Sequence, residues 1–119
     1  MAFKLKVGDR LDVPVKGEVA DGAGKLPFRF TLQMRRLDVA QYRAAMAPEA
    51  GTLVRDFLLD NGCDWRDQPL VMDEEGRPAP YSREAFECLL GLVGMEQICF
   101  EAYTQQLAAA SKAQGRTGN

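Results

Sequence analysis

Polar and apolar side chains alternate along residues 13 to 34, on both sides of a short segment, Asp21 to Gly24, that contains two glycines. A period of two is typical of strands with one buried face, and an Asp-Gly step between two such runs predicts a β-hairpin. Folding the chain about this turn gathers the large apolar groups on one face, in the expected pairs Val13 and Leu32, Val15 and Phe30, Gly17 and Phe28, and Val19 and Leu26. An isolated hairpin is only marginally stable, so other elements must cover that face.

Two prolines are compatible with this hairpin. In the same register Pro14 and Pro27 both fall on the polar face, where each missing N–H group can point away from the partner strand. The start of the chain also alternates, from Phe3 to Val7, and this predicts a third strand.

Four segments after the hairpin repeat apolar residues at helical spacing. The first begins after Asp38, a residue type that caps helix N-termini, and is closed by Pro48. The second is expected from about residue 48 to Asn61, with Gly62 as its stop signal.

The third and fourth helical segments follow a connector. Ser82 caps the third, whose apolar stripe extends to Val93 and ends at Gly94. The fourth runs from Met95 to about Ala108. Its inward-facing side chains are expected to include Ile98, Ala102 and Tyr103.

The stretch from Cys63 to Phe86 is predicted to be an ordered connector between two amphipathic helical patterns. Residues 69 to 73 predict a short extended run, and residues 74 to 77 (EEGR) predict a turn. Pro78 and Pro80 then keep their neighbours out of the helical region.

These patterns together predict an α+β fold, in which an N-terminal antiparallel β-hairpin or three-stranded sheet packs against about four α-helices. With 119 residues the chain fits one domain, which we expect over residues 1 to 111. Residues 112 to 119 are polar and glycine-containing, and they predict a disordered C-terminal tail.

Composition excludes several classes of partner. A net charge of −2 and a pI near 5.2 give no overall field that would attract phosphate or anionic lipid, so we expect no nucleic-acid and no membrane partner. No apolar run approaches the length of about 20 residues that a membrane-spanning helix needs, and the first residues lack a signal-peptide core. These features predict a cytoplasmic protein. Three cysteines predict no disulfide framework, with Cys88 and Cys99 in the core and Cys63 as the most exposed thiol.

The chain contains no histidine, which removes the commonest general base and most zinc sites. Two groups of acids could hold a divalent cation or act as acid and base, but the spacing of a calcium loop is absent. They are Asp60, Asp64 and Asp67, and Asp73, Glu74 and Glu75. We interpret both groups as solvated turn residues and predict no catalytic residue, no metal site and no cofactor.

Trp65 is the only tryptophan and has charged neighbours on both sides. It can dock the connector onto the helical core, or it can be an exposed anchor for a partner, as interface hot spots often are. We favour the structural role and keep the second open.

Several segments of the chain, between residue 10 and about residue 108, resemble the small tail assembly chaperones of long-tailed bacteriophages and prophages. The segments that carry the resemblance are Phe28 to Leu37 with Tyr42 after it, Trp65 to Val71, Gly76 to Pro78, Tyr81 to Phe86, and a last helix with Phe100 and Tyr103. The resemblance implies a non-catalytic chaperone in the cytoplasm of the bacterial host. Such a protein binds the long helical tape measure protein, keeps it soluble and helps tail-tube subunits to assemble along it.

A chaperone of this kind needs apolar surface that matches the apolar stripes of a helical partner. We expect part of that surface to be formed by Trp65, Leu70, Val71, Tyr81 and Tyr103. Methionines at positions 34, 46, 72 and 95 could also line it, because methionine adapts to varied partners. Two other functions stay open: a structural component of the phage tail or of head completion, and a small carboxylate- or metal-dependent enzyme.

Overall fold

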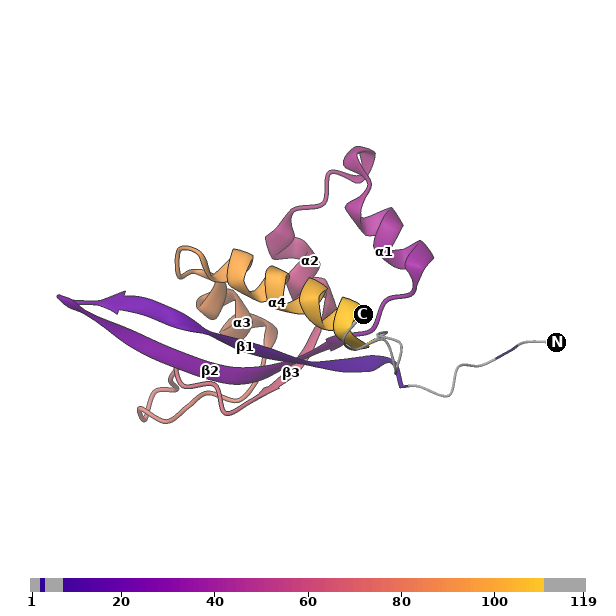
Figure 1. Cartoon of the computed structure of the whole chain (residues 1–119). Coiled ribbons are helices and arrows are strands. Elements are labelled where there is room, and N and C mark those ends of the chain that lie inside the picture. Colours follow the sequence, from indigo (N-terminus) through magenta and orange to yellow (C-terminus); the bar gives the residue numbers. More distant parts are fainter. Residues whose placement is uncertain (1–2, 4–7, 111–119) are drawn as a thin grey trace, which may run out of the picture.

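A long hairpin and one short strand form the sheet. The computed structural model describes residues 3 and 8 to 110, and its three strands are β1 (Arg10–Asp21), β2 (Gly24–Arg35) and β3 (Gly62–Arg66). They form an antiparallel sheet in the order β1-β2-β3. The helices lie on one side of this sheet, and the tip of the hairpin extends beyond them (Figure 1).

The register of the hairpin confirms the prediction. All four expected pairs are present, from Val13 with Leu32 to Val19 with Leu26. Odd-numbered residues of β1 face the core as far as Val15, and even-numbered residues are exposed. Gly22 closes the turn with a φ angle of +63°, which glycine adopts without strain.

The third strand is not the one that the sequence predicted. Residues 4 to 7 lie outside the described residues, and the strand that pairs with β2 is β3. The sequence predicts Gly62 only as a helix stop, whereas in the structure it both caps α2 and opens β3. A Cβ atom at Gly62 would lie 2.6 Å from the Tyr81 hydroxyl and 2.9 Å from the Phe86 ring, so the close packing of this strand requires glycine.

The structure has four α-helices and one short 3-10 helix in its described part. They are α1 (Val39–Met46), η1 (Pro48–Ala50), α2 (Val54–Asn61), α3 (Arg83–Leu90) and α4 (Met95–Ala110). Asp38 caps α1 as predicted: its carboxylate accepts a hydrogen bond from the Gln41 backbone N–H at 2.7 Å. The Ser82 hydroxyl likewise accepts one from the Ala85 N–H at 3.0 Å.

Two helix boundaries differ from the prediction. The second helix begins at Val54 and not near residue 48, because Gly51 adopts a φ angle of +63° and ends the η1 turn before α2 starts. The third helix ends at Leu90 with Gly91 as its cap, so Val93 leaves the apolar stripe and is fully exposed. Two cysteine predictions are wrong: Cys88, expected in the core, is exposed, and Cys63, expected to be the most exposed thiol, is half-buried. Cys99 is buried as predicted.

The core fills the space between the sheet and the helices. α4 packs along β1, and α2 and α3 pack against α4 and against each other. Phe86, Leu58 and Tyr103 are fully buried within one cluster together with the inward face of the hairpin. This arrangement confirms the predicted α+β fold of a three-stranded antiparallel sheet against four helices.

In the part of the chain that the structure describes, no helix combines the length and the apolar character needed to cross a membrane. The predicted tail over residues 112 to 119 lies outside the described residues.

Candidate functional site

The five predicted contact residues do not form one exposed surface. Trp65, Val71 and Tyr103 are buried in the core, with relative exposures of 6%, 8% and 0%. Leu70 and Tyr81 are half-buried and pack against the same core. Trp65, Val71 and Tyr103 therefore offer little or no surface to a partner in this structure, and we do not keep them in the proposed contact surface.

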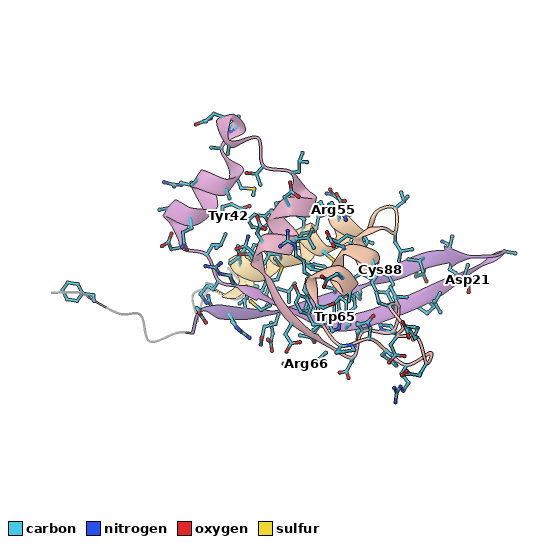
Figure 2. All side chains as sticks on the ribbon, turned by 180° about the vertical axis from the view of Figure 1, so that it is seen from behind. Asp21, Tyr42, Arg55, Trp65, Arg66 and Cys88 are labelled. Carbon is cyan, nitrogen blue, oxygen red and sulfur yellow. The ribbon has the colours of Figure 1, made fainter. Side chains whose placement is uncertain are left out.

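Trp65 docks the connector. Its indole Nε1 donates a hydrogen bond to the Ala79 carbonyl at 3.0 Å, fourteen residues further along the chain. Its ring makes edge contacts with Phe30, Tyr81 and Phe86, with centroids 6.4, 5.2 and 6.1 Å away. This is the structural role that we favoured from the sequence (Figure 2).

Gln68 organises the same connector, and no pattern in the sequence pointed to it. Its side chain is buried and makes four hydrogen bonds within the loop. Nε2 donates to the carbonyl oxygens of Val71 (2.7 Å) and Ala79 (3.2 Å), and Oε1 accepts from the N–H groups of Leu70 (3.0 Å) and Val71 (2.8 Å). A buried amide whose donor and acceptor are both used holds the loop in one conformation.

Tyr103 links α4 to the end of the sheet. Its hydroxyl donates a hydrogen bond to the Arg35 carbonyl at 2.9 Å, and its ring lies 5.6 Å from that of Phe57. Burial raises the pKa of the Tyr103 hydroxyl above its usual value, so this group stays protonated as a donor.

Most of the acids in the two groups have local structural partners. Asp60 lies 3.4 Å from the Arg83 guanidinium, and the Asp64 carboxylate accepts a hydrogen bond from the Trp65 N–H at 2.8 Å. Asp73 accepts hydrogen bonds from two backbone N–H groups of its own turn, both at 2.9 Å. Among the residues described, no three histidine, cysteine or acidic side chains come together in a group that could hold a metal ion.

Exposed aliphatic side chains occur on the helical side of the molecule, near the start of α2 and the turn between α3 and α4. Leu53 has a relative exposure of 65%, Leu92 of 39%, and Val93 is fully exposed. A hollow of about 530 Å³ lies between Val54 at the start of α2 and this turn. We define Leu53, Val54, Leu92 and Val93 as the apolar patch.

Arg55 and Glu96 also line this hollow, so charges of both signs border it. The turn is tight: the N–H groups of Leu92 and Met95 donate to the carbonyls of Leu89 and Leu92, both at 3.1 Å. Gly94 follows with a φ angle of +91°. Val93 gains nothing from burial within this chain, and Leu92 is buried only in part.

A second hollow, of about 380 Å³, lies between α1 and the last turns of α4. Its apolar lining consists of Leu37 just before α1, Val39 and Tyr42 of α1, and Leu107 and Ala108 of α4. We call it the α1–α4 groove. No residue of α1 is fully buried, and α1 lies farther from the sheet than the other helices (Figure 1).

Comparison of the chain with models of known protein families, with curated proteins and with solved structures found no match.

Proposed function

We propose that this chain is a non-catalytic tail assembly chaperone of a long-tailed phage or prophage. It would bind the tape measure protein in the cytoplasm of the bacterial host, keep that protein soluble and assist the assembly of the tail tube around it. The proposal starts from the resemblance of the segments Trp65 to Val71, Tyr81 to Phe86 and the last helix to this group of proteins.

The observation that carries the proposal is the apolar patch. Each aliphatic side chain that passes from water into a fully apolar contact contributes about 1.5 to 3 kcal/mol. Leu92 and Val93 line the same hollow as Val54, and the exposed Leu53 directly precedes Val54 in the chain. A contiguous exposed apolar surface on a folded protein commonly marks a contact site for another macromolecule.

An amphipathic helix is the partner that suits this surface best. Helix-in-groove recognition places apolar side chains spaced three and four residues apart into a hollow, with charged residues at its rim. The hollow beside Val54 can accept such side chains, and Arg55 and Glu96 can pair with charges that flank an apolar stripe. A tape measure protein exposes long stripes of this kind before the tube encloses it.

Co-expression with the tape measure protein of the same phage or prophage tests the proposal. The wild-type chain is expected to keep the tape measure protein in the soluble fraction and to co-purify with it. The double variant Leu53→Ser, Val93→Ser is expected to lose both effects, since it removes the two most exposed aliphatic side chains of the patch.

A matched control shows whether lost binding is specific to the apolar patch or follows from removing any exposed apolar side chain. Leu26 on the hairpin and Met72 in the connector have relative exposures of 44% and 49%, and they lie outside the patch. The variant Leu26→Ser, Met72→Ser should behave like the wild type. Equal co-purification of both double variants would remove the patch from the contact surface.

Mass spectrometry of purified particles addresses the rival structural role. An assembly chaperone leaves before the particle is complete, so its peptides should be absent from particles that contain the tube protein. Stoichiometric amounts in the particle would instead assign the chain to the tail or head structure.

A further inference from the structure

The sheet face that points away from the helices carries an excess of positive charge. Side chains alternate along each strand, so the polar residues of β1, β2 and β3 share this face. Its cations are Arg10, Lys16, Lys25, Arg29, Arg35 and Arg66, and we call it the basic face. Three carboxylates accompany these six cations, although the whole chain has a net charge of −2. Figure 2 shows Arg66 on the side of the sheet away from α1 and α2.

Two pairs of like charges lie directly across the strands. Lys16 is opposite Arg29, and Arg10 is opposite Arg35. Side chains in such positions have Cβ atoms about 4.5 to 5.5 Å apart, and like charges there destabilise the sheet. A sheet selected only for stability would place a carboxylate opposite each cation, so both pairs conflict with the fold that contains them.

The carboxylates of this face do not neutralise the two pairs of like charges. Asp12 is held by the Arg66 guanidinium at 2.7 Å and by the Gln33 amide at 3.1 Å. Glu18 lies 3.9 Å from Lys25. Among the contacts of the described residues, Lys16 and Arg29 have neither a hydrogen bond nor an ion pair through their side chains.

We propose that the basic face binds an acidic segment of a protein partner, with one group of carboxylates over each like-charged pair. Arg10 and Lys16 are six residues apart on β1, which corresponds to about 20 Å at a rise of about 3.4 Å per residue. A helical partner spans this distance with about 13 residues, at about 1.5 Å each. The partner therefore carries two acidic groups separated by about 20 Å, with neutral or basic residues between them.

The arrangement of charges selects a polypeptide over a nucleic acid. Asp12 lies between the two basic pairs along β1, and Asp64 lies in the same cross-strand row on β3, with Gln33 of β2 between them. A nucleic-acid strand has a phosphate at every nucleotide and would bring phosphates against these carboxylates. A polypeptide can place a neutral or basic side chain there, so it matches the whole pattern.

This site is independent of the proposed chaperone function. The basic face and the apolar patch lie on opposite sides of the sheet, so two partners can be bound at the same time. A negative result for peptide binding at the basic face would not bear on tape measure binding at the apolar patch, and the reverse also holds.

Fluorescence anisotropy with synthetic helical peptides tests the inference on the full chain. One peptide carries two glutamate groups about 13 residues apart, and a second has the same composition with the glutamates in one block. The spaced peptide is expected to bind about fivefold more tightly or better, and its affinity should fall as salt is added.

Charge-neutral variants locate the site. Lys16→Gln with Arg29→Gln, and Arg10→Gln with Arg35→Gln, should each weaken binding of the spaced peptide by about fivefold or more. The control Arg43→Gln with Arg83→Gln removes the same charge from α1 and α3, and should change the affinity by less than about twofold. Thermal melts should show that the basic-face variants are at least as stable as the wild type, because a repulsion is removed.

Three results would overturn the inference. The first is equal loss of affinity in the control and the basic-face variants. The second is tighter binding of a single-stranded oligonucleotide that the same variants abolish, which would assign the face to nucleic acid. The third is reversible self-association in sedimentation velocity that these variants abolish, without any peptide binding, which would assign the face to a second copy of the chain.

Discussion

Replacing Gln68 by alanine should destabilise the protein far more than its place in a loop suggests. The change removes all four hydrogen bonds of the buried amide. The Ala79 carbonyl keeps the Trp65 indole as a donor, and the Val71 carbonyl keeps the Ala79 N–H at 2.9 Å. The Val71 N–H loses its partner while buried, and the Leu70 N–H is half-exposed and can reach water. One orphaned donor at about 1 to 3 kcal/mol, and the lost bonds to the two carbonyls at about 0.5 to 1.5 kcal/mol each, give a loss of about 2 to 6 kcal/mol.

The variant Gln68→Glu tests the hydrogen bonds alone, because glutamate and glutamine have nearly the same side-chain volume. The introduced carboxylate keeps the two accepted bonds but turns the donor into an acceptor that faces two carbonyl oxygens. Burial and these carbonyls raise the pKa of the introduced carboxyl group above the usual glutamate value of about 4.3. The stability deficit relative to the wild type should therefore be largest near neutral pH and shrink as the pH falls through the raised pKa.

Urea unfolding followed by Trp65 fluorescence measures both effects, because this is the only tryptophan and it is buried against the connector. Gln97→Ala is the control: its amide bonds only to Glu101, in an exposed pair, and its removal should cost less than about 0.5 kcal/mol. A Gln68→Ala variant within that same margin of the wild type would refute the role given to this residue.

Three further outcomes are expected. Gly62→Ala should destabilise by about 1 to 3 kcal/mol in urea unfolding, because the new Cβ atom would lie 2.6 Å from the Tyr81 hydroxyl, and an unchanged midpoint would contradict that packing. The hydrogen bond from Arg66 holds the pKa of Asp12 below its usual value, so this contribution to stability is present at neutral pH and lost as the pH falls through the lowered pKa. NMR titration should show a higher pKa for Asp12 in the Arg66→Gln variant than in the wild type. Burial raises the pKa of the Cys99 thiol to about 12, so thiol reagents at pH 8 should modify this residue only at the rate of unfolding.

The hairpin was predictable because its signals are local. The period-two pattern fixes which side chains share a face, and this selects one register although an Asp-Gly turn permits a slip of one or two residues. The caps at Asp38 and Ser82 were predictable for the same reason, since each depends on a residue and its neighbours three positions on.

The elements that the sequence did not predict depend on contacts far along the chain. β3 has five residues, and its pairing with β2 and the burial of Trp65 hold it in place. Gly51 and Gly91 moved two helix boundaries because both positions also fit a longer helical pattern. If the apolar stripe of α3 continued past Gly91, Val93 would be buried. The turn after α3 instead places Val93 in solvent.

The candidate site was harder to predict for a related reason. Aromatic and aliphatic residues are common both in cores and in interfaces, and sequence alone does not tell which of them remains exposed. Trp65 and Tyr103 were named as contacts and belong to the core. A signal for the apolar patch was present in Leu92 and Val93, two apolar residues bracketed by glycines in a short helix-helix connection.

Calorimetric titration of the wild-type chain with its tape measure protein, repeated at several temperatures, tests most directly whether apolar surface is what this protein offers. Burial of the exposed aliphatic side chains predicts binding with a clearly negative heat-capacity change, which is reduced in the Leu53→Ser, Val93→Ser variant. Absence of binding, or binding with a heat-capacity change near zero that the patch variant leaves unaltered, would contradict the proposed function.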